Sequence, residues 1–168
     1  MTHEEMTSNT ATIVLTSPSF ADGEALPERF TCEGEGISPP LSWSGLPGNT
    51  RSVALIADDP DAPDPKAPQR TFVHWVLYDI PPSAGELPAG ATQDTVAVGT
   101  RIGKNDGGKS GWYPACPPIG RHRYFFKLYA LDTQLGALAD PTKAGLEKAM
   151  QGHIVGQGML MGTYQKKK

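Results

Sequence analysis

The chain has 168 residues, and its 19 glycines and 16 prolines make up about a fifth of them, whereas average usage is nearer an eighth. A domain takes roughly 150 residues, so we expect one domain with one core. The frequent glycine and proline exclude long helices. The 15 basic and 18 acidic side chains leave a net charge of −3, which provides no positive field to attract nucleic acid.

Short runs of β-branched and aromatic residues, bounded by turn residues, predict strands. In chain order these runs are 12–16, 53–57, 72–79, 95–98, 123–130 and 159–164. Runs 72–79 and 123–130 are bulky on both alternating faces, so we expect them to be central strands that are covered on each side. The longest uninterrupted apolar stretch, 53–57, is far shorter than the about 20 residues of a membrane-spanning helix, so we expect no transmembrane segment.

One helix is predicted near the end of the chain. Asp140-Pro141-Thr142 is a start signal, with proline suited to the first helical position, and Gly152 after Gln151 is a stop signal. We expect this helix to cap a body that is otherwise made of strands.

The two ends of the chain are expected to lie outside the domain. Residues 1–9 are predicted to be a disordered lead-in, 10–165 the single domain and 166–168 a basic, solvated tail. The first six residues are acidic and polar, without the basic start and apolar stretch of a secretory signal. We therefore predict a cytoplasmic protein.

Cys32 and Cys116 are the two cysteines of the chain. They form no CxxC pair, so no zinc site is expected. One disulfide is compatible with the sequence, but a reducing cytoplasm favours two thiols. Prolines directly follow Cys116 and no helix N-terminus is near to activate it, so we expect a buried, inert thiol.

An acidic, proline-rich run follows the predicted strand 53–57. It carries four carboxylates, Asp58, Asp59, Asp61 and Asp64, with prolines between them. A carboxylate held rigidly at the end of a strand can accept hydrogen bonds from a pocket or orient an imidazole. The alternative is a solvated turn in which the aspartates bond local amides.

His74 lies within the predicted strand 72–79. Strict alternation places it on the face opposite Val73 and Trp75. A histidine among such neighbours must be neutral and hydrogen-bonded within the core, or it must face a cavity.

His122 and Tyr124 fall on the same face at the start of the predicted strand 123–130, and Arg123 falls on the other. A ring and donors side by side suit a small anion or a polar head group. Arg123 can also pair with one of the aspartates, such as Asp61. The extended, proline-rich segment 112–118 is suited to wall a pocket.

No common catalytic motif accompanies these residues. The sequence lacks GxSxG, HExxH, the phosphate-binding GxxxxGK[ST] and a GxGxxG between strand and helix. Their absence excludes the usual hydrolase, zinc-protease and nucleotide-enzyme classes.

Taken together in order, several segments resemble the phosphatidylethanolamine-binding protein family, in its bacterial branch labelled Raf kinase inhibitor-like. The segments are FTCEG at 30–34, SPPLSW at 38–43, DPDAP at 59–63, VHWVLYDIP at 73–81, CPP at 116–118 with HRY at 122–124, and YALD at 129–132. The resemblance implies a mostly β fold: a two-sheet antiparallel β-sandwich with Greek-key connections and a short C-terminal helix.

The resemblance also implies a small pocket for phosphate or phosphorylated head groups, without catalysis, metal or cofactor. The pocket residues it implies are Asp59, His74, His122 and Tyr124, with walls from Ala62, Pro63 and Pro117. Bacterial members usually have Gly-Pro where Pro114-Ala115 precedes Cys116 here. The lost glycine removes a backbone N–H and a position that tolerates positive φ.

Three functions are compatible with these residues. The first is a non-enzymatic protein that binds phosphate, a phosphorylated small molecule or a lipid head group, with His74, His122 and Tyr124 donating to the anion and Asp59 fixing a histidine tautomer. The second is a protein-level inhibitor or regulator of a protease or kinase that acts through the proline-stiffened loops 58–68 and 105–118. The third is a hydrolase or metal enzyme built on Asp59, His74 and His122.

Overall fold

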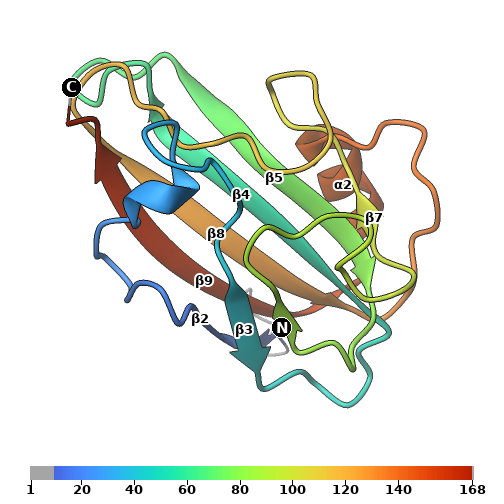
Figure 1. Ribbon diagram of the computed structural model, residues 1–168. Helices are drawn as coiled ribbons and strands as arrows, with labels where there is room; N and C mark the ends of the chain where they lie inside the picture. The colour runs from blue at the N-terminus through green and yellow to red at the C-terminus, as the bar shows by residue number, and fades with distance from the viewer. Residues whose placement is uncertain (1–9, 168) are drawn as a thin grey trace, which may run out of the picture.

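The computed structural model describes residues 10–167, and the predicted lead-in 1–9 and Lys168 lie outside the described residues. The elements form two sheets, with strand order β1-β9-β8-β4-β5-β7 in the larger and β2-β3-β6 in the smaller (Figure 1). Their bounds are β1 Ala11–Thr12, β2 Val14–Thr16, η1 Glu28–Phe30, β3 Leu41–Ser44, β4 Ser52–Ala62, β5 Arg70–Ile80, β6 Glu86–Leu87, β7 Arg101–Ile102, β8 Arg121–Leu131, α2 Lys143–Met150 and β9 Ile154–Gln165.

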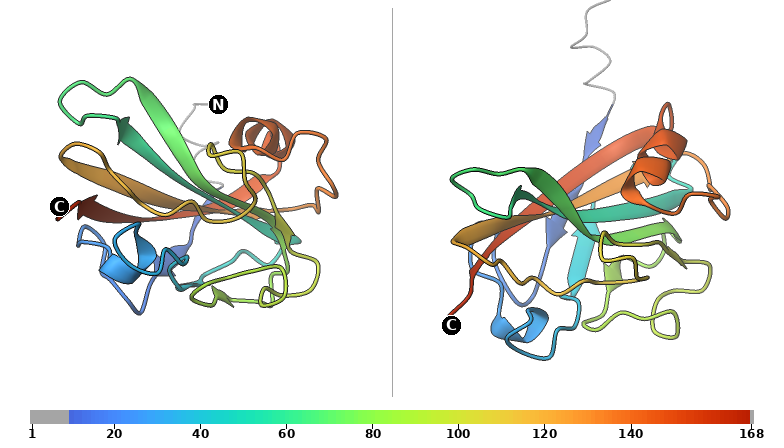
Figure 2. Two further views of the ribbon diagram at one scale, coloured as in Figure 1. Left: turned by 45° about the horizontal axis from the view of Figure 1, so that its top comes forward. Right: turned by 90° about the horizontal axis from the view of Figure 1, so that it is seen from above.

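The predicted β-sandwich is confirmed. Neighbouring strands are antiparallel, except that β1 runs parallel to β9. Strands β4 and β5 are adjacent in sequence and in space, and β8 then returns to lie beside β4, as in a Greek key. Figure 2 shows the small sheet and its loops on one face of the large sheet and helix α2 on the other.

The large sheet is buried on both faces because each face has its own apolar core. Leu55 and Leu77 belong to the inner core between the sheets, and Ile56 and Val76 belong to the outer core beneath α2. Successive residues of β4 and β5 thus face different cores, which makes both strands apolar throughout. The central positions predicted for runs 72–79 and 123–130 are confirmed.

Two of the predicted strands differ in the structure. Run 95–98 forms turns, with Val98 97% exposed and the Thr95 and Val96 amides donating to the Thr92 carbonyl. Run 12–16 is divided between β1 and β2, which belong to different sheets. Strands β6 and β7 have two residues each, too few for an alternation of polar and apolar side chains. Strand β3 does alternate, as Leu-Ser-Trp-Ser, but was not predicted.

The predicted helix is present and begins later than expected. Thr142 is its N-cap and accepts from the Gly145 amide, so Pro141 precedes the cap instead of occupying the first helical turn. Leu146 and Met150 bury the helix in the outer core. The helix lies between β8 and β9, so β9 and not the helix ends the fold.

The expectation of two free thiols is wrong, because Cys32 and Cys116 form a disulfide with an S–S distance of 2.09 Å and a Cα–Cα distance of 5.3 Å. Both cysteines are also exposed, not buried. Sequence spacing could not predict the bridge, since 84 positions separate the two residues and only the fold brings their Cα atoms within bonding range.

At the end of the chain, the backbone amide of exposed Lys167 donates to Glu33 at 2.9 Å.

Candidate ligand-binding pocket

A cavity of about 390 Å³, within the usual size range of small-molecule sites, lies where β4, β5 and β8 meet the segment that contains Cys116. Every residue implied as a pocket residue by the sequence lines it, although the sequence separation between them reaches tens of residues. The lining residues are Asp59, Ala62, Pro63, Gln69, Arg70, Phe72, His74, Tyr113, Cys116, Pro117, Pro118, His122 and Tyr124.

Asp59 and His122 form the buried polar base of the cavity, from adjacent strands β4 and β8. The His122 Nδ1 atom lies 2.6 Å from Asp59 Oδ2, and both side chains are almost completely buried. The second carboxylate oxygen of Asp59 accepts from the Asp61 amide at 2.7 Å. Asp59 is thereby held rigidly, and it orients the imidazole.

The other nitrogen of His122 also faces acceptors. Nε2 lies 3.0 Å from the Pro63 carbonyl oxygen and 2.9 Å from the Ile119 carbonyl oxygen. A carboxylate and carbonyls only accept, so the ring nitrogens of His122 are the donors in these contacts. Both nitrogens are thus used within the protein, and His122 offers the cavity its ring face.

A β-bulge turns His74 toward the cavity. On β4, Asp58 and Ala57 are consecutive, but their partners on β5 are Val73 and Trp75, which leaves His74 as the extra residue. Val73 packs in the outer core, whereas Trp75 packs in the inner core. The predicted alternation, with Val73 and Trp75 on one face, is thus wrong at this point, because a bulge puts two successive residues on nearly the same side.

His74 is held as a neutral ring with one nitrogen left over. Its Nδ1–H donates to the Tyr113 carbonyl at 2.7 Å. Burial lowers the pKa of His74, and this effect outweighs the raising effects of the Tyr113 carbonyl and of Asp59. Within residues 10–167, Nε2 has no hydrogen-bond partner in the protein, so it carries the free lone pair in the neutral ring.

Tyr124 stands beside His74 with its rings in edge-to-face contact, at a centroid distance of 5.2 Å. Burial raises its pKa, and the negative charges of Asp59 and Asp61 raise it further. The phenol therefore keeps its proton and is a hydrogen-bond donor at the cavity.

The acidic run is not a solvated turn. Asp58, Asp59 and Asp61 all lie within β4 and are buried. The expected pairing of Arg123 with Asp61 is confirmed, with Nη2–Oδ1 at 2.8 Å and Nε–Oδ2 at 3.0 Å. These hydrogen bonds lower the pKa of Asp61.

Asp58 faces away from the cavity, toward the helix side of the sheet. It pairs with Lys143 at 2.7 Å and with Lys127 at 3.1 Å. Lys143 is the first residue of α2, so this buried carboxylate ties the helix to the sheet. Of the aspartates in β4, Asp59 lines the pocket, whereas Asp58 and Asp61 form ion pairs that stabilise the fold.

Tyr113 and Pro118 belong to segment 112–118, which the sequence predicted as a pocket wall, but sequence reasoning did not find Gln69, Arg70 or Phe72 as lining residues. The Arg70 guanidinium lies over the Phe72 ring, 5.0 Å from its centroid, and 3.5 Å from the Asp106 carboxylate. Residues 70, 72 and 74 have the spacing of one strand face. Extending that alternation backward from His74 would have identified the first two.

The unusual Pro114-Ala115 pair lies beside the pocket, and neither residue is among those that line the cavity. Ala115 is fully buried in the inner core, and its carbonyl accepts from the Cys32 amide at 3.0 Å. The substitution of the usual glycine therefore changes the support of the wall and not its inner surface.

A two-sheet sandwich with a polar cavity at one end of the large sheet defines a class of small-ligand-binding β-proteins. The family model described as phosphatidylethanolamine-binding protein matches residues 16–165, and the chain belongs to this family. Membership supports a ligand-binding protein. No helix in the described part of the chain is long and apolar enough to cross a membrane.

Several bacterial and archaeal relatives are similar to this chain over nearly their whole length. A UPF0098 protein of Methanothermobacter thermautotrophicus is 44% identical over 162 residues, covering 90% of this chain and 98% of the relative. The crystal structure of a putative phosphatidylethanolamine-binding protein homologue from Chlamydia trachomatis has a TM-score of 0.85 at 39% identity, covering 94% of this chain and 100% of the other. That of E. coli YbcL has a TM-score of 0.82 at 31% identity, covering 92% and 99%.

Proposed function

We propose that the chain is a non-enzymatic binding protein whose cavity takes a phosphate-type anion, either free or as part of a phosphorylated head group. The observation that carries the proposal is the pair of polar atoms, His74 Nε2 and the Tyr124 hydroxyl, that face the cavity without a protein partner in the described chain. A buried cavity with convergent polar groups that are not satisfied by the protein is typical of a ligand site.

The charges around the cavity favour an anion. The Arg70 guanidinium is in the lining, together with the His122 ring. Both carboxylate oxygens of Asp59 are already hydrogen-bonded, one to His122 and the other to the Asp61 amide. Arg70 and Tyr124 supply N–H and O–H donors of the kind that phosphate oxygens accept.

His74 makes the cavity prefer one protonation state of the phosphate. As a neutral ring, its Nε2 accepts a hydrogen bond from a P–O–H group, so it suits a monoprotonated phosphate. For a fully ionised phosphate the ring must take up a proton, which its burial opposes. Binding is therefore expected to strengthen as the pH falls through the range in which phosphate monoesters gain their proton, around pH 6.

Two features support binding without catalysis. Both His122 nitrogens are bonded within the protein, so a proton relay or a metal bond at this ring would first have to break those bonds. Cys116 is in a disulfide and offers no thiolate. A hydrolase or metal site built on Asp59, His74 and His122 is thus disfavoured.

Titration calorimetry with O-phosphorylethanolamine and with inorganic phosphate tests the proposal, combined with NMR of the imidazole signals. We expect the His74 and His122 signals to shift on titration. His153, which bonds Asp132 at 2.8 Å away from the cavity, is the internal control. If neither cavity histidine responds to either compound, the proposed function is wrong.

Inhibition of another protein is a second candidate, favoured by the exposed apolar side chains of Tyr113 and Ile119 beside the cavity, at 37% and 53% exposure. Residues 58–62 of the expected contact loop belong to β4, so the exposed surface would come from 63–68 and 105–118. A protease panel tests it: inhibition should survive His74→Ala and be lost in Tyr113→Ser.

The cytoplasmic location stays a prediction, and the disulfide bears on it. Persistent disulfides are typical of oxidising compartments. In a reducing compartment, the Cys32–Cys116 bridge would exchange with the thiol pool.

A further inference from the structure

A short segment forms one wall of the cavity, and the residues that flank it at its two ends contact the two pocket histidines. The segment is 114–118, here called the wall segment, and its Cys116, Pro117 and Pro118 line the cavity. On one side it continues from Tyr113, which exchanges two hydrogen bonds with His74, at 2.8 Å from the Tyr113 amide and 2.7 Å to its carbonyl. On the other side it continues to Ile119, whose carbonyl lies 2.9 Å from His122 Nε2.

Between these two anchors the wall segment is attached mainly at Ala115, which is fully buried and pairs with Thr31 in a short parallel bridge. Three of its residues are prolines, which have no N–H to donate. Ala115 accepts one hydrogen bond from the Cys32 amide at 3.0 Å. In the described part of the chain, no hydrogen bond joins Cys116, Pro117 or Pro118 to another segment.

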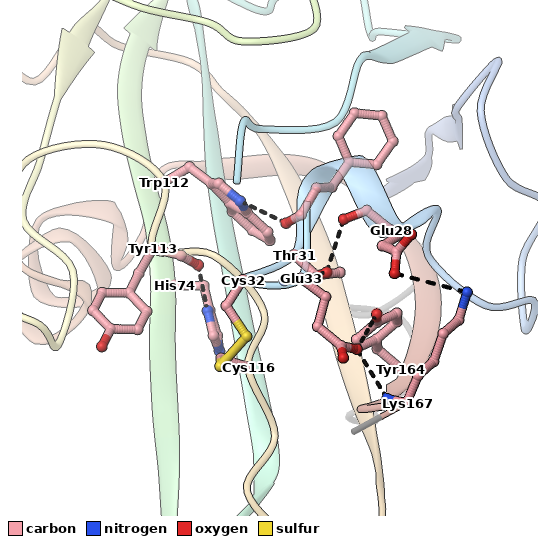
Figure 3. Close-up of a disulfide and its surroundings, with 11 residues drawn as sticks. Glu28, Thr31, Cys32, Glu33, His74, Trp112, Tyr113, Cys116, Tyr164 and Lys167 are labelled. Atoms are coloured by element: carbon pink, nitrogen blue, oxygen red, sulfur yellow. Dashed lines mark hydrogen bonds and ion pairs between the residues drawn. A yellow bond between two sulfur atoms is a disulfide. The ribbon is translucent and has the colours of Figure 1, made fainter. Parts of the chain in front are cut away.

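The disulfide attaches residues 116–118 to the rest of the fold, and Cys32, at its other end, lies in a loop held by hydrogen bonds. Figure 3 shows the bridge beside His74 and Tyr113, with the pale-blue loop that carries Cys32 on its other side. In that loop, Thr31 is fully buried, its hydroxyl donates to the Glu28 carbonyl at 2.8 Å, and the Glu33 amide donates to the same hydroxyl at 3.2 Å. Cys32 is thus held firmly in its loop, and the disulfide attaches Cys116 and the wall segment to this loop.

The same bridge is open to reagents, because both cysteines are exposed. Accessible disulfides are the ones that exchange readily with thiols, whereas buried ones resist. The disulfide attaches one wall of the ligand site and is also accessible to thiols. A thiol reaction at the disulfide can therefore change the structure of the site.

We propose that the Cys32–Cys116 disulfide is an exchange site for low-molecular-weight thiols and that its state sets the affinity of the cavity, a proposal that rests on the anion-binding function above. A thiolate attacks the Sγ of Cys32, which is outside the cavity lining; a new S–S bond forms, the old one breaks and the electron pair leaves on Cys116 as a thiolate. A second thiol then displaces Cys32. In total, two thiols are oxidised to their disulfide and the bridge is reduced to two protein thiols, and the reverse reaction restores it.

Reduction frees the wall without removing any group that contacts the anion. The cavity then loses preorganisation, so binding must first order the wall segment again. By linkage, an anion that prefers the bridged form must make the bridge harder to reduce, by the same factor.

Calorimetry with O-phosphorylethanolamine on the oxidised protein and on protein reduced with dithiothreitol tests the first half of this proposal. We expect the reduced protein to bind about tenfold more weakly, which is the scale of the ordering cost for a few loop residues. Cys32→Ser leaves Cys116 in the wall and breaks the bridge, so it should bind like the reduced protein and ignore the reductant. Equal affinity in both redox states overturns the proposal and leaves the proposed function intact; no binding to the oxidised protein removes both.

Equilibration in glutathione buffers tests the second half. The ratio of reduced to bridged protein is measured by thiol alkylation and mass analysis, with and without saturating O-phosphorylethanolamine. We expect the probe to shift this ratio toward the bridged form by the factor by which reduction weakens binding. An unshifted ratio, or loss of the near-ultraviolet circular dichroism spectrum on reduction, overturns the proposal, since the bridge would then act on the whole fold and not on the wall.

Discussion

Asp59 and His122 lie 63 positions apart in the chain, and their side chains meet at 2.6 Å in the buried base of the cavity. The contact joins β4 to β8 at the end of the sheet. It satisfies a buried carboxylate and fixes the orientation of the imidazole ring next to the cavity.

Replacing this carboxylate with an amide should cost stability. Asp59→Asn removes the carboxylate that bonds the buried His122 ring, and breaking a buried hydrogen bond to a charged group from one side costs about 2 kcal/mol. Urea unfolding at pH 7 measures the loss. Asp64→Asn is the matched control, since Asp64 is only half-buried and bonds a local amide of Lys66; an equal effect in the two variants would contradict the assignment.

Stability should depend on pH through His74. Burial lowers its pKa in the folded state below the ordinary value of 6.5, so below pH 6.5 the unfolded state binds the extra proton first. The free energy of unfolding is therefore highest above pH 6.5 and falls as the pH drops toward the folded-state pKa. Urea unfolding from pH 7.5 to pH 5 should show this slope in the native chain and a smaller slope in His74→Gln, while His153→Gln keeps it.

The Tyr124 hydroxyl should matter for binding more than for folding. Tyr124→Phe keeps the ring contact with His74 and removes only the donor, so O-phosphorylethanolamine should bind about tenfold more weakly, the size of one hydrogen bond to a charged group. Calorimetry measures the affinity. Tyr129→Phe removes a hydroxyl on the outer-core face, away from the cavity, and should bind normally; an unchanged affinity in Tyr124→Phe would remove its hydroxyl from the proposed contacts.

The ion pair between Asp61 and Arg123 should support acid stability. The Arg123 hydrogen bonds lower the Asp61 pKa below 3.8 in the folded state, so this stability is present above pH 3.8 and is lost as the pH falls through the folded-state value. Arg123→Gln should be less stable than the native chain at pH 7, with the difference shrinking toward pH 2. A difference that stays constant over this range would show that the pairing charge is not the cause.

The outer core should be separable from the pocket. Leu146→Ala empties a fully buried site under α2 and should cost about 3 kcal/mol. Binding of O-phosphorylethanolamine should not change, because this core lies on the opposite face of the sheet from the cavity. The exposed Lys148→Ala in the same helix is the control for stability.

Some site residues could be placed from the sequence because their arrangement is local. His122 and Tyr124 share a face in β8 since side chains of a strand alternate, and the regular pairing of residues 121–130 with β9 keeps that alternation. The same local logic correctly placed the long strands and the helix, whose stop signal at Gly152 lies next to Gln151 in the chain.

His74 shows where this reasoning ends. Its direction depends on a bulge, and a bulge is a mismatch between two strands that exists only when they are paired. The turns at 95–98 are similar, because an apolar run forms a strand only where a neighbouring strand is there to accept its hydrogen bonds.

The sequence by itself indicated the class of fold, the family and a part of the cavity lining, since alternation, turn residues and motifs are written in consecutive positions. Only the tertiary structure determined which groups are used within the protein and which remain for a ligand: His122 bonded at both nitrogens, His74 at one, and Cys116 joined to Cys32. The physical reason is that hydrogen bonds and disulfides depend on distances of a few ångströms between residues that are far apart in the chain, and folding alone sets those distances.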